Sequence, residues 1–226
     1  MNNISKEDYL SIIFKFQNTS GEIKPIAIAR KLKISQAAVT DMLKKLATEK
    51  YILYEKYKGI RLTRRGEEYA RNMVRRHRIW EVFLQKVVGM PWDKVHQEAH
   101  QLEHSSSDTL IDRLEELLRY PEFDPHGDPI PSKEGKIPKI KKHLPLSDLK
   151  EGESGIVVRV NDFDEQFLNY ITSLGISLNE IIRVKENREF DNSLLVQIKG
   201  KPWNISQKLA ENIFVEVRKV KGSSNG

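Results

Sequence analysis

Residues 25–46, PIAIARKLKISQAAVTDMLKKL, decide the fold of the first part of the chain. Pro25 is well placed at the first turn of a short helix, where its missing N–H costs nothing. Ser35 can cap a second helix, along which apolar residues recur every three or four positions and share one face. The stretch therefore predicts two short helices joined by a tight turn.

The flanking residues extend this pair into a larger motif. EDYLSIIFKF (7–16) has the apolar spacing of a helix, and YILYEKYKGIRLT (51–63) has two strand-like pieces around Lys58-Gly59. Three helices followed by a hairpin is the order of a winged helix-turn-helix, in which residues 35–46 would be the recognition helix. A long helix is then expected from about Arg64 to Val88.

The positive charge is concentrated in this first third. The net charge is +6, and residues 1–73 contain 15 Lys or Arg against 8 Asp or Glu. Such a distribution favours phosphate contacts, although a helical bundle with a solvated basic face would also be basic. The helix-turn-helix order together with the charge predicts binding to double-stranded DNA. The expected DNA-contacting residues are Ser35, Gln36, Ala37, Thr40, Lys44, Lys58 and Arg61.

A second motif, HQEAHQLEH, occupies residues 96–104. On a helix, His96, His100, Glu103 and His104 fall within an arc of about 100°, whereas Glu98 points the other way. A hydrolytic zinc motif would need a glutamate directly after the first histidine, and that position is Gln97. The pattern therefore predicts metal binding without catalysis, and the protein is not expected to be an enzyme.

His77 and Glu81 are spaced i,i+4 on the expected long helix and can join this group. The short turn Gly89-Met90-Pro91 predicts that the two helices pack antiparallel, so that imidazoles and carboxylates face each other. Such a set suits Mn²⁺, Fe²⁺, Co²⁺, Ni²⁺ or Zn²⁺. The alternative is that these are solvated His–Glu pairs on a helix surface.

The second half of the chain changes character. Six of the nine prolines lie between Pro121 and Pro145, which predicts an irregular connection. Short β-like runs such as GIVVRV and SLLVQIK follow, with one helical piece, DEQFLNYITSLG, and predict a small barrel. The expected fold is mainly α with a β module. Its domains are 1–73 (winged helix-turn-helix), 74–144 (helical dimerisation and metal-binding domain with the Pro-rich linker), 145–220 (barrel) and a disordered tail at 221–226.

Composition sets further bounds. The chain has 226 residues and no cysteine, which excludes disulfides and thiolate ligands. No apolar run approaches the roughly 18 residues of a membrane span, and the N-terminus has no signal-peptide pattern. A cytoplasmic location without a membrane partner is expected. Since winged domains of this kind read half-sites, we also expect a homodimer on an inverted-repeat operator.

With these residues assembled, the chain resembles the diphtheria-toxin-repressor family of metal-dependent transcriptional repressors, including its manganese-transport-regulator branch. The resemblance runs over essentially the full length. It is carried by the EDYLSIIFKF start, the winged motif, RRHRIWE, KVHQEAHQLEHSSSDTLIDRLEELL and the PHGDPIP turn. The last domain is similar to the SH3-like, FeoA-type module of longer members, which agrees with the expected barrel.

The resemblance implies a division of the ligands into two sites. The regulatory site falls on Asp8, His100, Glu103 and His104, and the second site falls on His77, Glu81 and His96. Asp8 has another interpretation, because it can close a capping box with Ser5 at the start of the first helix. Further ligands suggested by the family pattern are His126, Gln166, Asp162 and Asp164.

Some positions depart from the family pattern and bear on the choice of ion. Asp8 stands where iron-responsive members have methionine, as in manganese-responsive ones, but Ser11 replaces a glutamate common in the manganese branch. His100 stands where Cys or Glu is usual. The expected cofactor is Mn²⁺ or Fe²⁺, with Co²⁺, Ni²⁺ or Zn²⁺ able to substitute.

The expected function is repression of metal-homeostasis genes when the ion is plentiful, with no organic small-molecule substrate. Two alternatives from other classes stay open at this point. One is a winged-helix regulator that responds to an organic ligand, with the histidines structural. The other is a metalloenzyme with an accessory DNA domain, for which the sequence offers no general base.

Overall fold

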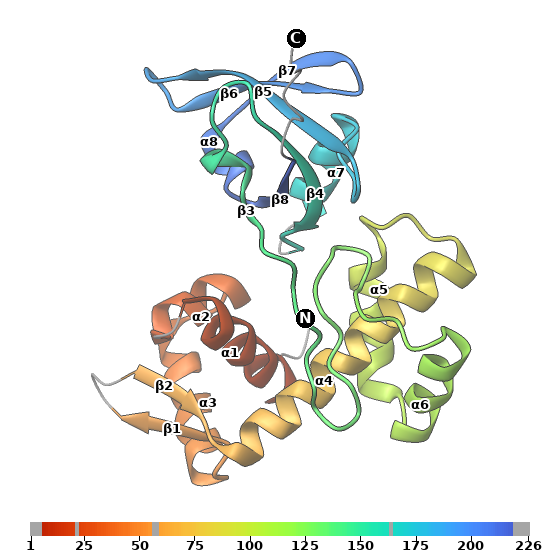
Figure 1. Ribbon diagram of the computed structural model, residues 1–226. Helices are drawn as coiled ribbons and strands as arrows, with labels where there is room; N and C mark the ends of the chain where they lie inside the picture. Colours follow the sequence, from red (N-terminus) through yellow and green to blue (C-terminus); the bar gives the residue numbers. More distant parts are fainter. Residues whose placement is uncertain (1–5, 21–22, 56–58, 163–164, 219–226) are drawn as a thin grey trace. The chain divides into compact units, whose positions relative to one another are not determined.

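The computed structural model describes residues 6–20, 23–55, 59–162 and 165–218 (Figure 1). It consists of two compact units. The first unit is formed by Met1–His77 with Pro131–Ile137, and the second by Arg78–Ile130 with Pro138–Gly226. None of the described helices is long and apolar enough to cross a membrane. The predicted tail, 221–226, lies outside the described residues, as does Ser5, the expected capping partner of Asp8.

The first unit is a winged helix-turn-helix, as the sequence predicts. Its elements are α1 (Lys6–Ser20), α2 (Pro25–Leu32), α3 (Gln36–Thr48), the antiparallel strands β1 (Ile52–Glu55) and β2 (Gly59–Leu62), and the first turns of α4 (Arg64–Phe83). Pro25 opens α2, and the Ser35 side chain accepts a hydrogen bond from the Ala38 N–H at the start of α3. Both predicted helix starts are confirmed.

The core of this unit is built from the apolar faces of these helices. Val39, Leu43 and Leu46 of α3 are buried with residues of α1 and the wing. Ile23 forms an isolated antiparallel β-bridge with Ile60 of β2. The burial of one helix face leaves the opposite, polar face of α3 exposed to solvent.

The helices of the second unit follow from the end of α4. A π-helical segment, η1 (Leu84–Val88), continues α4 and ends at Gly89, which has a positive φ of 80°. α5 (Val95–Ser105) and α6 (Asp108–Leu117) follow, and Ser107 caps α6 through the Leu110 N–H. The sequence pattern predicts helix starts at about Asp93 and about Asp108, within two residues of the observed starts of α5 and α6.

Residues 118–143 contain no helix or strand, as the prolines predict. The first part of this irregular connection is packed, since Asp124, His126 and Ile130 are buried. The cause is a tight turn, in which Asp124 N–H donates to Asp128 O and Phe123 bridges Pro129. This segment, residues 124–130, is called the DPHGD loop below.

The remainder of the second unit is a small barrel-like sheet. Its antiparallel strands lie in the order β3-β8-β4-β5-β6-β7. The strand bounds are β3 (Leu144–Pro145), β4 (Ser154–Val160), β5 (Ile181–Arg188), β6 (Ser193–Ile198), β7 (Lys201–Ile205) and β8 (Ile213–Arg218). The predicted helix within this region is α7 (Glu165–Ser173), and two short turns, η2 (Leu146–Asp148) and α8 (Gln207–Ala210), complete it.

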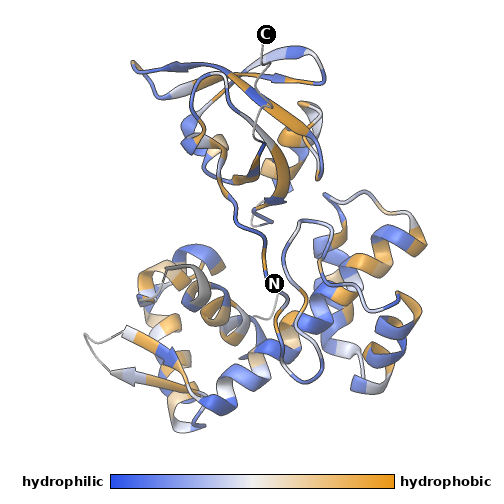
Figure 2. Cartoon of the chain, in the orientation of Figure 1, coloured by the Kyte–Doolittle hydropathy of each residue, from blue (hydrophilic) through white to orange (hydrophobic). Residues whose placement is uncertain are grey.

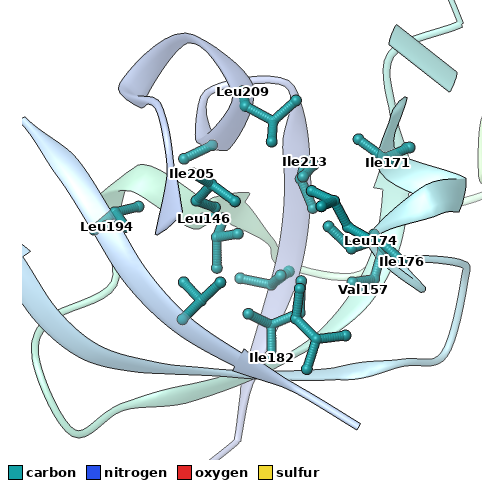
Figure 3. Packing of buried hydrophobic residues seen from close by; sticks show 14 of the residues in the cluster. Leu146, Val157, Ile171, Leu174, Ile176, Ile182, Leu194, Ile205, Leu209 and Ile213 are labelled. Atoms are coloured by element: carbon teal, nitrogen blue, oxygen red, sulfur yellow. The ribbon is translucent and has the colours of Figure 1, made fainter. Parts of the chain in front are cut away.

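One apolar core holds this sheet together. Val157, Ile182 and Val196, from three neighbouring strands, are buried with Ile171 of α7 (Figure 3). Figure 2 shows the barrel strands largely in the hydrophobic colour, whereas the first turns of α4 are hydrophilic. The fold is therefore mainly α with a β module, as expected from the sequence.

Candidate metal centre

Glu81 is the central residue of the candidate metal centre. It lies on α4 with its side chain fully buried, and His96 from α5 places Nδ1 3.0 Å from Glu81 Oε1. His126 from the DPHGD loop places Nδ1 3.7 Å from the other carboxylate oxygen, Oε2. Two imidazoles from different segments thus face one carboxylate.

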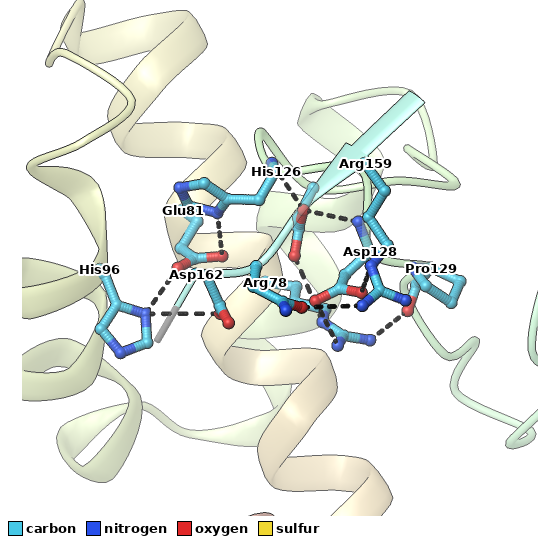
Figure 4. Close-up of polar contacts among 10 residues, drawn as sticks. Arg78, Glu81, His96, His126, Asp128, Pro129, Arg159 and Asp162 are labelled. Atoms are coloured by element: carbon cyan, nitrogen blue, oxygen red, sulfur yellow. Dashed lines mark hydrogen bonds and ion pairs between the residues drawn. The ribbon is translucent and has the colours of Figure 1, made fainter. Parts of the chain in front are cut away.

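Asp162 completes this group from the barrel side. It follows β4, is buried, and places Oδ2 3.8 Å from His96 Nδ1. The candidate ligand atoms of Glu81, His126 and Asp162 all lie within 4.8 Å of one another. Figure 4 shows these side chains pointing toward one another. We call Glu81, His96, His126 and Asp162 the Glu81 cluster.

His126 is held in an orientation that suits a ligand. Its Nε2 lies 2.9 Å from the Trp92 carbonyl oxygen, and its ring stacks on Trp92 with centroids 5.7 Å apart. A carbonyl can only accept, so Nε2 carries a proton, and Nδ1, which faces Glu81, can bind either a second proton or a metal ion. Metal-binding histidines in proteins are commonly fixed in this way.

Burial and charge act in opposite directions on His126. Burial lowers the pKa of this imidazole, but hydrogen bonding and attraction to Glu81, followed by Asp124 and Asp162, outweigh burial and raise the pKa to about 9. Burial, then the negative charges of Glu81 and Asp128, raise the pKa of the Asp124 carboxyl to about 7. The cluster therefore carries excess negative charge in a buried site, which attracts protons and other cations.

The donor set fits a divalent transition metal. Two carboxylates and two imidazoles provide oxygen and nitrogen ligands, and the chain has no cysteine to provide sulfur. Carboxylates suit Mn²⁺, and imidazoles suit Fe²⁺, Co²⁺, Ni²⁺ and Zn²⁺. The residues present are compatible with any of these ions.

A second group of ligand-type residues lies further along α5. His100 Nδ1 is 3.0 Å and His104 Nε2 is 3.4 Å from the same oxygen, Glu103 Oε1. Glu103 is buried, while the two imidazoles are partly exposed and meet edge to face. The one-sided arc predicted from the sequence is thus observed. We call these three residues the α5 trio.

The other predicted ligands come from further segments of the chain. Asp8 is half-buried on α1 of the first unit, and His77 is buried on α4, four residues before Glu81. Gln166 is exposed on α7, and Asp164 lies outside the described residues. The neighbouring Glu165 is engaged by α5, since it pairs with Lys94 and accepts a hydrogen bond of 2.6 Å from Gln97.

The sequence analysis missed a group of charged residues beside the Glu81 cluster. Arg78 Nε lies 3.3 Å from Asp124 Oδ2, and Arg78 Nη2 lies 3.3 Å from Asp128 Oδ2. Arg159 Nε lies 3.4 Å from Asp128 Oδ1. The charged residues can be seen in the sequence, because RRHR and DPHGD place them next to predicted ligands. Nothing in the sequence indicates which arginine pairs with which aspartate.

The predicted DNA-contacting residues gather at the start of α3 and on the wing. Gln36 and Ala37 are exposed, and Thr40 is half-buried with its hydroxyl donating to Gln36 O. Ser35 Oγ is occupied as the helix cap, which leaves its hydroxyl proton to donate. Lys44 and Arg61 are exposed, and Lys58 lies outside the described residues.

A winged helix-turn-helix joined to a chain segment with clustered metal ligands defines a metal-dependent DNA-binding regulator. Three family models match this chain. They are "Iron dependent repressor, N-terminal DNA binding domain" (residues 3–60), "Iron dependent repressor, metal binding and dimerisation domain" (residues 63–132) and "FeoA domain" (residues 144–217). The chain belongs to the family of iron-dependent repressors, which are transcriptional regulators and not enzymes.

Relatives within this family are similar over most of their length. The HTH-type transcriptional regulator MntR of Bacillus subtilis (strain 168) is 34% identical over 120 residues, which are 53% of this chain and 84% of that protein. MntR of Oceanobacillus iheyensis is 31% identical over 150 residues, 66% of this chain and 95% of the relative. A manganese-dependent transcriptional repressor in complex with manganese superposes with a TM-score of 0.87 at 34% identity, covering 95% of this chain and 100% of that one.

The family match decides between the functions left open by the sequence. Members dimerise and bind DNA as metal-dependent repressors, and the DNA-binding domain of this chain matches theirs. A regulator that senses an organic ligand does not fit this match. The metalloenzyme alternative is excluded as well, because the family consists of repressors.

Proposed function

We propose that this protein represses metal-homeostasis genes as a cytoplasmic homodimer, bound to an inverted-repeat operator when it is loaded with Mn²⁺ or Fe²⁺. The observation that carries the proposal is the Glu81 cluster, in which two carboxylates and two imidazoles converge from α4, α5, the DPHGD loop and the end of β4. Its donor set favours a divalent transition metal over an organic effector.

The proposal includes two metal sites per chain. We assign the first to Asp8 with the α5 trio, supported by the family resemblance for Asp8 and by the contacts within the trio. The second is the Glu81 cluster, to which His77 can add an imidazole because it lies one turn earlier on α4. We do not include Gln166 or Asp164 in either set.

The first site links metal loading to DNA binding. A bound divalent cation supplies positive charge that Asp8 of α1 and the α5 trio can share as ligands. Asp8 lies on the first helix of the winged unit, so fixing it restrains that unit and with it α3, which carries Gln36 and Thr40. In the metal-free protein, DNA binding includes the free-energy cost of ordering the two units, and the apparent affinity falls accordingly.

The second site restrains the barrel. Glu81 and His96 belong to the helices, whereas Asp162 follows β4 of the barrel. Ligands from both parts favour one arrangement of the second unit. The Lys94–Glu165 pair and the Trp92–Thr172 hydrogen bond of 2.9 Å act between the same two parts. The barrel thus contributes to the metal-binding part.

A gel-shift titration on promoter DNA tests the proposal. We expect full-length protein to bind its operator in the presence of Mn²⁺ or anaerobic Fe²⁺, and to lose most of this affinity when a chelator is added. Co²⁺ and Zn²⁺ are run in parallel to rank the ions. DNA affinity that is the same with metal and with chelator would refute the proposed switch.

The choice of ion is tested by a substitution at the first site. Asp8→Met replaces a hard carboxylate with a soft thioether, so it should weaken activation by Mn²⁺ more than activation by Fe²⁺. The readout is the concentration of each ion that gives half-maximal operator binding. An equal change for both ions would show that Asp8 does not select between them.

A further inference from the structure

We infer that Asp128 is a positioning residue that holds the ligands of the Glu81 cluster in place without binding the metal itself. The inference rests on the proposed function of that cluster as a metal site. Asp128 lies in the DPHGD loop. Each of its two carboxylate oxygens forms an ion pair with a different arginine.

The two arginines come from two separate parts of the second unit. Arg78 belongs to α4 and contacts Asp128 Oδ2 at 3.3 Å, while Arg159 belongs to β4 and contacts Asp128 Oδ1 at 3.4 Å. The side chains of both arginines and of Asp128 are largely shielded from water. Figure 4 shows the contacts between them. Salt screens such buried pairs much less than surface pairs.

Each arginine stands three residues before a carboxylate of the cluster. Arg78 precedes Glu81 on α4, so both residues lie on the same side of the helix. Arg159 precedes Asp162 at the end of β4. By joining the two arginines, Asp128 fixes the distance between the two backbone segments that supply the cluster carboxylates.

The third segment, which carries His126, is the DPHGD loop, to which Asp128 itself belongs. The N–H groups of Asp128 and His126 donate to Asp124 Oδ1, at 3.0 Å and 2.8 Å. Asp124 N–H donates in turn to Asp128 O at 2.9 Å, which closes the loop. Asp124, which stands two residues before His126, thus shapes the loop and is turned toward Arg78.

Asp128 therefore ties α4, β4 and the DPHGD loop together at one point. The cluster places two carboxylates close together in a buried site, where they repel each other in the absence of a cation. Holding them in place before the ion arrives lowers the cost of ordering the ligands on binding. Loss of a residue that orients ligands in this way commonly reduces metal affinity about 10–100-fold.

The test uses full-length protein and the variants Asp128→Asn, Arg159→Gln and their combination. Asp148→Asn is the matched control, since it removes one negative charge from an exposed position of the same unit. Mn²⁺ affinity is measured by calorimetry at a temperature where circular dichroism shows every variant to be folded. Hydrogen exchange of the DPHGD loop amides is followed in the metal-free protein.

We expect Asp128→Asn and Arg159→Gln each to weaken Mn²⁺ binding at the Glu81 cluster at least tenfold, and Asp148→Asn to match the wild type. Because both substitutions break one shared ion pair, the double variant should lose little more than either single variant. The loop amides of His126 and Asp128 should exchange faster in both single variants. Arg159→Gln provides the test if Asp128→Asn does not fold.

Glu81→Gln separates failure of this inference from failure of the proposed function. If Glu81→Gln binds Mn²⁺ as the wild type does, the cluster is not a metal site, and the second metal site of the proposed function is wrong. If Glu81→Gln weakens binding while Asp128→Asn and Arg159→Gln stay within twofold of the wild type, Asp128 has no positioning role. If the losses of Mn²⁺ affinity in the two single variants add up in the double variant, the positioning role of Asp128 is also overturned.

Discussion

His126 Nδ1 lies 3.7 Å from Glu81 Oε2, and both side chains are completely buried. The contact joins α4 to the DPHGD loop, two segments that are far apart in the sequence. A buried imidazole beside a buried carboxylate can bind either a proton or a metal ion, and the two compete. The first two predictions follow from this contact.

Replacing His126 removes a ligand and leaves the buried Glu81 with one fewer partner. We predict that His126→Ala lowers Mn²⁺ affinity at the Glu81 cluster at least tenfold, measured by calorimetry on the full chain. His143→Ala is the control, because His143 contacts Lys141 O and the Phe214 ring away from the cluster. Equal affinities of the two variants would remove His126 from the ligand set.

The raised pKa of His126 sets a pH dependence for the metal-free protein. Its folded-state pKa of about 9 exceeds the ordinary value of 6.5, so its contribution to stability is fully present below pH 6.5 and is lost as pH rises toward 9. The raised pKa of Asp124 acts in the same direction at lower pH. We predict that the metal-free protein unfolds at lower urea concentration at pH 8.5 than at pH 6.5.

Added Mn²⁺ should reverse this trend, because the ion needs the deprotonated imidazole and binds more tightly as pH rises. The gain in stability that Mn²⁺ gives in urea unfolding should therefore be larger at pH 8.5 than at pH 6.5. In His126→Ala, the metal-free protein should lose less stability between pH 6.5 and 8.5 than the wild type does. The stability gained from Mn²⁺ should also be smaller. A metal-free protein that becomes more stable toward pH 8.5 would contradict the assignment of this proton to His126.

The α5 trio gives a separate prediction for DNA binding. Glu103→Gln keeps the shape of the side chain but removes the charge that His100 and His104 share, at 3.0 Å and 3.4 Å. We predict that metal-stimulated operator binding is lost while sedimentation still shows a dimer. Glu98→Gln is the control on the same helix, since Glu98 is exposed. If both variants bind the operator as the wild type does, the trio is not the regulatory site.

The sequence was sufficient for features that depend on neighbouring residues. Ser35 acts as a helix cap and the α5 trio lies on one side of its helix, because both relations depend only on residues close together in the sequence. Strand β7 contains Pro202, a residue that disfavours a strand interior, and the sheet tolerates it because β7 is an edge strand.

Contacts between distant segments could not be predicted in the same way. The family resemblance groups His96 with His77 and Glu81, but only the tertiary fold brings Asp162 within 3.8 Å of His96 Nδ1. The pairing of Asp128 with Arg78 and Arg159 depends equally on the packing of the loop between α4 and β4. Resemblance to a family suggested His126 and Asp162, whereas the residues that hold them in place carried no such signal.

Gly127 explains how His126 is able to reach the cluster, and it yields the last prediction. Its φ of +90° is unfavourable for other residues, and a Cβ at this position would lie 2.1 Å from the Val158 carbonyl oxygen of β4. The absence of a side chain lets the loop lie directly against β4, where His126 O accepts a hydrogen bond of 2.9 Å from Val160 N–H.

Gly127→Ala should therefore push the loop away from β4 and move His126 with it. Gly152→Ala is the matched control, because its φ of +83° imposes a similar backbone penalty, about 1–2 kcal/mol, while no atom lies within 4 Å of the added Cβ. We predict that Gly127→Ala loses more stability in urea unfolding than Gly152→Ala and also weakens Mn²⁺ binding. Gly152→Ala should retain wild-type Mn²⁺ affinity, since only its backbone conformation is penalised. Equal effects of the two substitutions on stability and on Mn²⁺ affinity would show that close contact between the loop and β4 does not position His126.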